Sequence, residues 1–130
     1  MIDLKKIQQK MDISFDICNL AYLKNFVPGV VQSIDIPFTI DGFDSETAVS
    51  VIYNEEQIIE YTKQHNFLCH EHDFEELPNN KVIIAEDVGG SPIILDLITG
   101  AVLLFWFDFD GKLALLFDNL EMFYNSLIFE

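Results

Sequence analysis

The spacing of apolar residues predicts two helices and a pair of strands in the first half of the chain. Apolar positions recur at helical intervals over residues 2–11, and again over a second stretch that ends at Pro28-Gly29. Residues 30–39 are rich in Val, Ile and Phe, and residues 47–53 have a similar composition. Because Asp41-Gly42 is a strong turn signal, these two stretches are expected to pair as antiparallel strands.

A further helix is predicted to follow Asn54. Asn54 and Gln57 form a capping-box pattern, in which each side chain bonds the backbone amide of the other residue. Ile58 and Thr62 then lie four residues apart, on one face of the helix. Residues 66–80 are polar and acidic and end in Pro-Asn-Asn, so they are expected to form a loop.

The second half predicts an antiparallel meander closed by a helix. Its apolar stretches are separated by turns that contain glycine, and they cover residues 81–86, 92–97, 101–107 and 112–116. Helical spacing of apolar residues then indicates a closing helix over residues 117–128. The whole pattern predicts one α+β domain over residues 1–130. A single antiparallel, meander-rich sheet packs against N-terminal helices and a C-terminal helix.

Charge narrows the classes of partner. Seven Lys, no Arg and 22 acidic residues give a net charge of −15. Such a field repels nucleic acids and anionic lipid surfaces, whereas it attracts basic proteins. Residues 1–65 have five Lys and ten acids, net −5, and residues 66–130 have two Lys and twelve acids, net −10. The second half is therefore the expected binding face, although solubility alone also accounts for the acidity.

The cysteines and the apolar runs indicate a cytoplasmic protein. Cys18 and Cys69 are the two cysteines, and the N-terminus has no long apolar leader. The longest apolar run, residues 97–107, is too short to cross a bilayer and contains the turn signal Thr99-Gly100. Reduced thiols are expected.

Residues 103–111 resemble the motifs of two kinds of functional site, a phosphatase active site and a calcium-binding loop. An apolar strand followed by Asp108-Phe109-Asp110-Gly111 resembles the first motif of haloacid-dehalogenase-like phosphatases, whose first Asp is the nucleophile. Those enzymes need further motifs downstream, and only 19 residues follow Gly111. A calcium loop with Gly111 at its sixth position would have Trp106 and Phe117 where carboxylates are required. A hairpin turn at Asp110-Gly111 is the expected structure.

The segment Cys69-His70-Glu71-His72-Asp73 gathers residue types that bind metals. In an extended segment His70 and His72 would share a side. A catalytic zinc site needs about three protein ligands and an ordered surrounding shell. A solvated connector is the favoured interpretation, with opportunistic metal binding and a metal-dependent enzyme as the alternatives. No metal or other cofactor is expected.

Residues 81–130 resemble the SUKH superfamily, the domain of the yeast Smi/Knr cell-wall regulators. The resemblance lies in an apolar strand followed by Glu86-Asp87-Val88-Gly89-Gly90, then a Leu95-Asp96-Leu97 strand, and an aromatic strand ending in Asp108-Phe109-Asp110. Upstream, residues 53–59 resemble the family's helix after a strand-end Tyr. The resemblance implies an α+β fold and a non-catalytic role. Many bacterial members look like immunity proteins that neutralise a toxin, often a nuclease, and others are regulators or scaffolds.

The charge and the resemblance together predict an immunity protein that binds a basic toxin domain. A nuclease needs a positive surface to hold its substrate, and an acidic inhibitor can occupy that surface. The alternative is a regulatory or scaffolding module. The expected state is a monomer or weak homodimer. The candidate partner-binding residues are Glu86, Asp87, Asp108 and Asp110, with Glu71, Asp73, Glu75 and Glu76 beside them.

Overall fold

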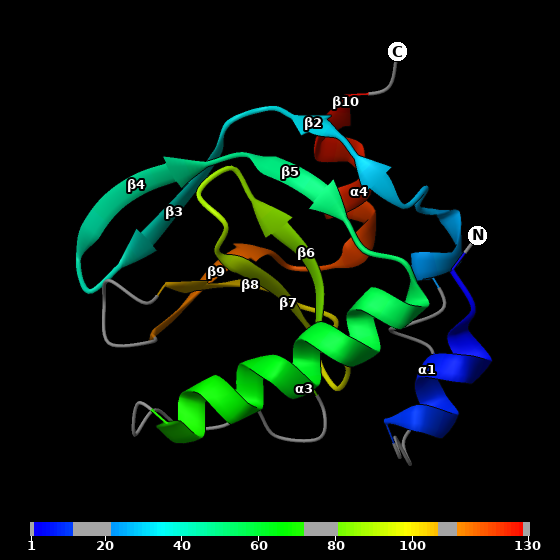
Figure 1. Cartoon of the computed structure of the whole chain (residues 1–130). Coiled ribbons are helices and arrows are strands. Elements are labelled where there is room, and N and C mark those ends of the chain that lie inside the picture. The colour runs from blue at the N-terminus through cyan, green and yellow to red at the C-terminus, as the bar shows by residue number, and fades with distance from the viewer. Residues whose placement is uncertain (1, 12–21, 72–80, 107–111, 129–130) are drawn as a thin grey trace.

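The fold is α+β, as the sequence predicts, and it is built on a six-stranded antiparallel sheet (Figure 1). The computed structural model describes residues 2–11, 22–71, 81–106 and 112–128, with backbone alone for residues 66–71. The sheet has the strand order β1-β5-β6-β7-β8-β9. Its strands are β1 (Gly29–Val30), β5 (Val49–Ile52), β6 (Lys81–Asp87), β7 (Pro92–Asp96), β8 (Val102–Trp106) and β9 (Lys112–Phe117). The last four form the predicted meander.

Two short ribbons complete the β structure. Strand β3 (Ile36–Ile40) pairs with β4 (Phe43–Thr47), and β2 (Gln32–Ser33) pairs with β10 (Leu127–Ile128). Asp41 and Gly42, with φ of 51° and 81°, make the turn of the β3–β4 ribbon. This ribbon bends over the sheet and lies against β9 (Figure 1).

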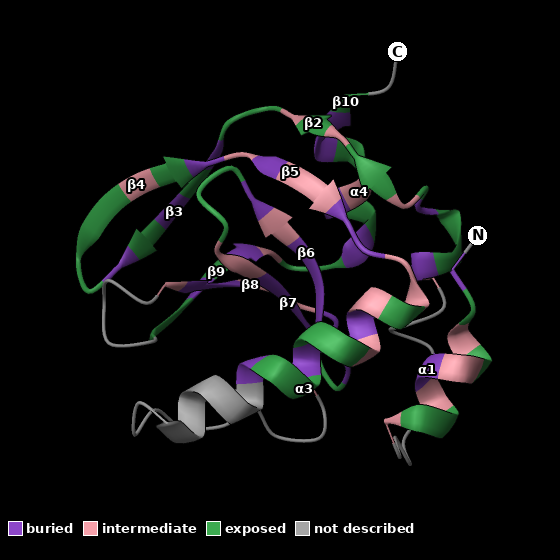
Figure 2. Ribbon diagram, in the orientation of Figure 1, coloured by how far each residue is buried: buried purple, intermediate pink, exposed green. Residues whose placement is uncertain are grey.

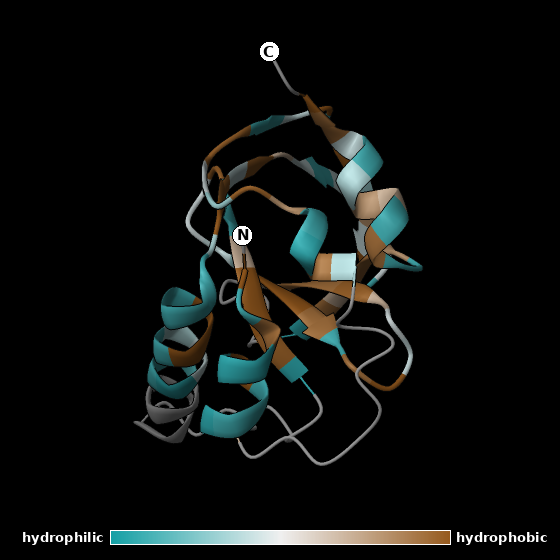
Figure 3. Cartoon of the chain, turned by 90° about the vertical axis from the view of Figure 1, so that its right-hand side faces the viewer, coloured by the Kyte–Doolittle hydropathy of each residue, from teal (hydrophilic) through white to brown (hydrophobic). Residues whose placement is uncertain are grey.

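Helices cover the two faces of the sheet (Figure 3). Helix α3 (Glu55–Glu71) lies on one face, with α1 (Leu4–Lys10) packed against it. The other face is covered by α4 (Leu120–Ser126), by the 3₁₀ helix η1 (Tyr22–Asn25) and by the β3–β4 ribbon. Because both faces are covered, residues 82–85 of β6 and 93–95 of β7 are buried at every position (Figure 2).

Local capping fixes where the helices begin. Asn54 Oδ1 accepts a 2.9 Å bond from the Gln57 amide, and Gln57 Oε1 accepts a 3.0 Å bond from the Asn54 amide. The predicted capping box is therefore confirmed. Asn119 caps α4 by accepting from the Met122 amide at 2.9 Å. The described part of the chain contains no helix long and apolar enough to span a bilayer.

Four expectations about element boundaries are wrong. The strand expected over residues 30–39 is divided among the end of β1, β2 and most of β3. The partner of β3 is β4, whereas residues 49–52 belong to the main sheet. Residues 66–71, expected in a loop, continue α3, since no Gly or Pro interrupts the chain there. The closing helix spans only residues 120–126, because Phe117 pairs with Val102 in the sheet.

Candidate functional site

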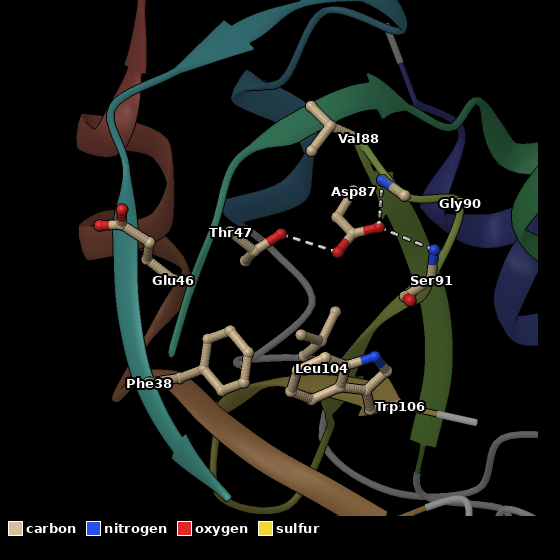
Figure 4. A pocket seen from close by; sticks show the side chains of 10 residues that line it. Phe38, Glu46, Thr47, Asp87, Val88, Gly90, Ser91, Leu104 and Trp106 are labelled. Atoms are coloured by element: carbon tan, nitrogen blue, oxygen red, sulfur yellow. Dashed lines mark hydrogen bonds between the residues drawn. The ribbon is translucent and has the colours of Figure 1, made fainter. Parts of the chain in front are cut away.

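The turn between β6 and β7 is held by the carboxylate of Asp87. Its Oδ1 accepts hydrogen bonds from the amides of Gly89 at 3.0 Å and Ser91 at 2.7 Å. Its Oδ2 accepts from Thr47 Oγ1 at 2.7 Å (Figure 4). Gly90 completes the turn with a φ of 84°, a value that favours glycine. Asp87 is 8 % exposed, so its buried carboxylate holds the turn through these hydrogen bonds.

A pocket of about 410 Å³ lies beside this turn, between the β3–β4 ribbon and the sheet. Phe38 of the ribbon points into it and meets Trp106 of β8, with ring centroids 5.4 Å apart and planes at 72° (Figure 4). Glu46 and Val88 also line it: the carboxylate of Glu46 points outward, and Val88 is 70 % exposed. We call this cavity the Asp87 pocket. It offers aromatic walls next to a charged ribbon.

The neighbouring residue, Glu86, faces the opposite side of the sheet. It lines a second pocket of about 270 Å³ at the side of α3, which we call the Glu86 pocket. Successive side chains of a strand point to opposite faces, so Glu86 and Asp87 serve different cavities. The side chains that line the Glu86 pocket are those of Tyr53, Tyr61, Gln64, His65, Ile83, Glu86 and Pro92.

Two titratable groups of the Glu86 pocket have shifted pKa values. Burial lowers the pKa of His65, whose ring meets Phe105 edge-on at a centroid distance of 4.4 Å. The imidazole is therefore neutral at pH 7. Burial, followed by the charge of Glu86 and a hydrogen bond with it, raises the pKa of Tyr53. The hydroxyl of Tyr53 therefore stays protonated beside this carboxylate.

The β3–β4 ribbon carries acidic residues that the sequence analysis did not select. We call Asp35, Asp41, Asp44 and Glu46, all exposed, the acidic ribbon. Lys112 donates a 2.6 Å hydrogen bond to Asp41, and Asp44 accepts one from Thr39 at 2.9 Å. A signal for this surface exists in the sequence, since residues 25–62 have seven acids and no Lys or Arg. The stretch does not show when the net charge is summed over residues 1–65, because the lysines of that half offset its acids.

Lysines gather at the other end of the molecule, between α1 and α3. Lys6, Lys10 and Lys63 line a shallow pocket there with Glu56 and Glu60. Lys6 and Glu56 form an exposed ion pair of 2.9 Å, which raises the pKa of Lys6 and lowers that of Glu56. The charge is thus unevenly distributed, with the acidic ribbon remote from the three lysines between α1 and α3 (Figure 1).

The structure places three of the eight predicted partner-binding residues. Glu86 and Asp87 lie on opposite faces, so they do not form one carboxylate cluster. Glu71 is the last residue of α3. The other five lie outside the described residues: Asp73, Glu75, Glu76, Asp108 and Asp110.

The predicted metal-binding segment is only partly described. His70 lies in α3, which makes its backbone helical and not extended, while His72 and Asp73 are outside the described residues. Among the side chains that the structure does describe, no three of His, Cys, Asp and Glu form a group that could hold a metal ion.

Comparisons with known proteins identify no relative. No family model matches this chain, and no curated protein or solved structure matches it significantly. The α+β fold is established by the structure itself. The resemblance to the SUKH superfamily stays a prediction, and function has to be argued from the surface.

Proposed function

We propose that this protein is a non-catalytic binder of a basic protein. The observation that carries this proposal is the acidic ribbon: four exposed acidic side chains on one projecting hairpin and its approach, with Lys112 paired to one of them. Exposed charges that are not neutralised nearby produce the field that steers an oppositely charged protein during encounter.

Apolar groups beside these carboxylates supply contact area. Val88 is 70 % exposed next to the Asp87 pocket, and Phe43 is 64 % exposed in β4. Protein interfaces commonly have apolar or aromatic anchors at the centre and charged residues at the rim. The ribbon and the β6–β7 turn together have this composition, so we propose them as the docking face.

The proposed partner is a toxin, which makes this chain an immunity protein. The net charge of −15 suits a nuclease-type toxin, because such an enzyme needs a positive surface for its substrate. The resemblance to the SUKH superfamily supports the same class. A cytoplasmic location is part of this proposal.

Co-expression with the product of the adjacent gene tests the proposal. We expect the two proteins to purify together, the chain to restore growth of cells that express the toxin, and affinity to fall steeply between 50 and 500 mM salt, in the range where screening removes the attraction of exposed charges. A complex whose affinity does not change with salt would contradict the role of the acidic ribbon. Capture of a host protein without any protection from a toxin would favour a regulatory module instead.

A further inference from the structure

The Glu86 pocket has the composition of a cation-binding site. Tyr53 and Tyr61 form an aromatic wall, with ring centroids 4.7 Å apart and planes tilted by 45°. Tyr61 is 36 % exposed and Tyr53 is 7 % exposed, so the wall is open to solvent at one end and buried at the other. Glu86 lies beside this wall, half-buried, and interacts with the Tyr53 hydroxyl.

The carboxylate of Glu86 favours a positive ligand in this pocket. Among the described residues that line it there is no Lys, and the neutral imidazole of His65 adds no positive charge at pH 7. A carboxylate has about four sites that accept hydrogen bonds, so a bond from the Tyr53 hydroxyl leaves room for a cationic donor. Aromatic faces attract cations through their quadrupole, and tyrosine walls beside a carboxylate are suited to ammonium and guanidinium groups.

The volume of the pocket limits the size of the ligand that it can hold. Its volume of about 270 Å³ lies below the range of roughly 300–1,000 Å³ that is typical of pockets for drug-sized molecules. A single long side chain with a terminal charge matches this volume, with its methylene groups against the tyrosine rings and its charge at Glu86.

We propose that the Glu86 pocket is an anchor site for one basic side chain of the partner protein, with the ammonium group of a lysine or the guanidinium group of an arginine at Glu86. This inference rests on the proposed function for the identity of the partner. The affinity of the pocket for a cation is a property of this chain alone. An inserted basic side chain at a pocket of this kind would act as an interface hot spot.

Titration of the full chain with Nα-acetyl-lysine amide and with Nα-acetyl-arginine amide tests the pocket by two-dimensional NMR. We expect saturable shifts at Tyr53, Tyr61 and Glu86, and a tighter response to one probe identifies the preferred cation. The uncharged probe Nα-acetyl-norleucine amide is expected to leave these signals in place. Shifts spread over the acidic ribbon, with no response at the pocket, would overturn the proposal.

Substitutions separate the pocket from general charge attraction. E86Q keeps an oxygen that can accept from Tyr53 and removes the charge, so probe binding is expected to weaken about tenfold. Y61L removes one aromatic face and is expected to weaken it by about two- to fivefold. E121Q removes one exposed charge of α4, away from the pocket lining, and serves as the matched control. Equal weakening by E86Q and E121Q would overturn the proposal.

The two proposals fail in different ways. Probe binding at the pocket without any basic protein partner would refute the proposed function and leave the pocket in place. A salt-sensitive complex whose affinity is the same with E86Q would refute the anchor site and leave the proposed function in place. Circular dichroism of each variant confirms that the chain is folded before these comparisons are made.

Discussion

The hydroxyl of Thr47 donates a 2.7 Å hydrogen bond to Oδ2 of Asp87, 40 residues further along the chain. This bond joins the end of β4 to the turn after β6, so it ties the acidic ribbon to the central sheet. Both residues are 8 % exposed. A buried hydroxyl and a buried carboxylate satisfy each other at this junction.

Loss of the Asp87 carboxylate is expected to destabilise the fold. D87A leaves the buried Thr47 hydroxyl and the amides of Gly89 and Ser91 without their acceptor, so the free energy of unfolding should fall by about 2–3 kcal/mol. D87N keeps one oxygen for the two amides and should cost about 1 kcal/mol. Urea unfolding measures both values.

A double-mutant cycle tests the bond itself. If Thr47 and Asp87 stabilise the fold through each other, T47V and D87A together will cost less than the sum of their separate costs. E86Q changes the neighbouring residue, on the opposite face, and serves as the control: its cost and that of T47V should add. A fully additive cycle would show that the two residues act independently.

Stability is also expected to depend on pH through His65. Burial lowers its pKa in the folded chain below the ordinary value of 6.5. On acidification the unfolded chain therefore binds more protons at this residue than the folded chain does, and acid favours unfolding. The contribution is complete above about pH 6.5 and is lost as the pH falls towards the lowered pKa. H65Q should flatten this part of the curve of unfolding free energy against pH. An unchanged slope in H65Q would assign the pH dependence to other groups.

Features set by short stretches of sequence were predictable. The Asn54–Gln57 capping box depends on residues three apart, and the Asp41-Gly42 turn depends on its own backbone preference. The meander after residue 81 also follows from the order of its strands, with Gly90 and Gly100 in the turns after β6 and β7. In each case the residues that decide the structure are close together in the chain, so their pattern is sufficient.

Pairing and grouping over longer distances were not predictable. The Asp41-Gly42 turn is a local signal that residues 43–47 pair with β3. The more apolar residues 49–52 outweighed that signal, and they pair with β1 and β6 instead. The separation of Glu86 from Asp87 is an exception, because it follows from the alternation of consecutive strand side chains, and grouping the two residues by charge alone missed it. The Glu86 pocket is lined by side chains that follow β5 or lie in α3 and β6, and no spacing along the sequence predicts that these side chains are neighbours.

The contact between Phe38 and Trp106 is expected to hold the β3–β4 ribbon over the sheet. F38A removes a side chain that is 6 % exposed, so unfolding free energy should fall by about 3–4 kcal/mol. Trp106 is the single tryptophan, and its fluorescence should shift to longer wavelength as water reaches its ring. T39S, at the next and exposed position, keeps the hydroxyl that bonds Asp44, so it should change stability by less than about 0.5 kcal/mol and leave the emission unchanged.

Reversal of charge on the acidic ribbon should slow association with the basic partner. Asp44 and Glu46 are exposed in β4, and D44K with E46K changes the net charge by four units at the proposed docking face. We expect the association rate at low salt to fall about tenfold, with a smaller effect at high salt, because steering is screened there.

The matched control for this reversal changes the net charge equally at other positions. Glu60 of α3 and Glu121 of α4 are exposed and lie outside the ribbon, so E60K with E121K tests the effect of total charge alone. Stopped-flow association at several salt concentrations compares the two variants. Because the field of a charge weakens with distance over a Debye length of about 10 Å at 0.1 M salt, the ribbon variant should be the slower one. Equal rates would mean that net charge drives the encounter without a docking face at the ribbon.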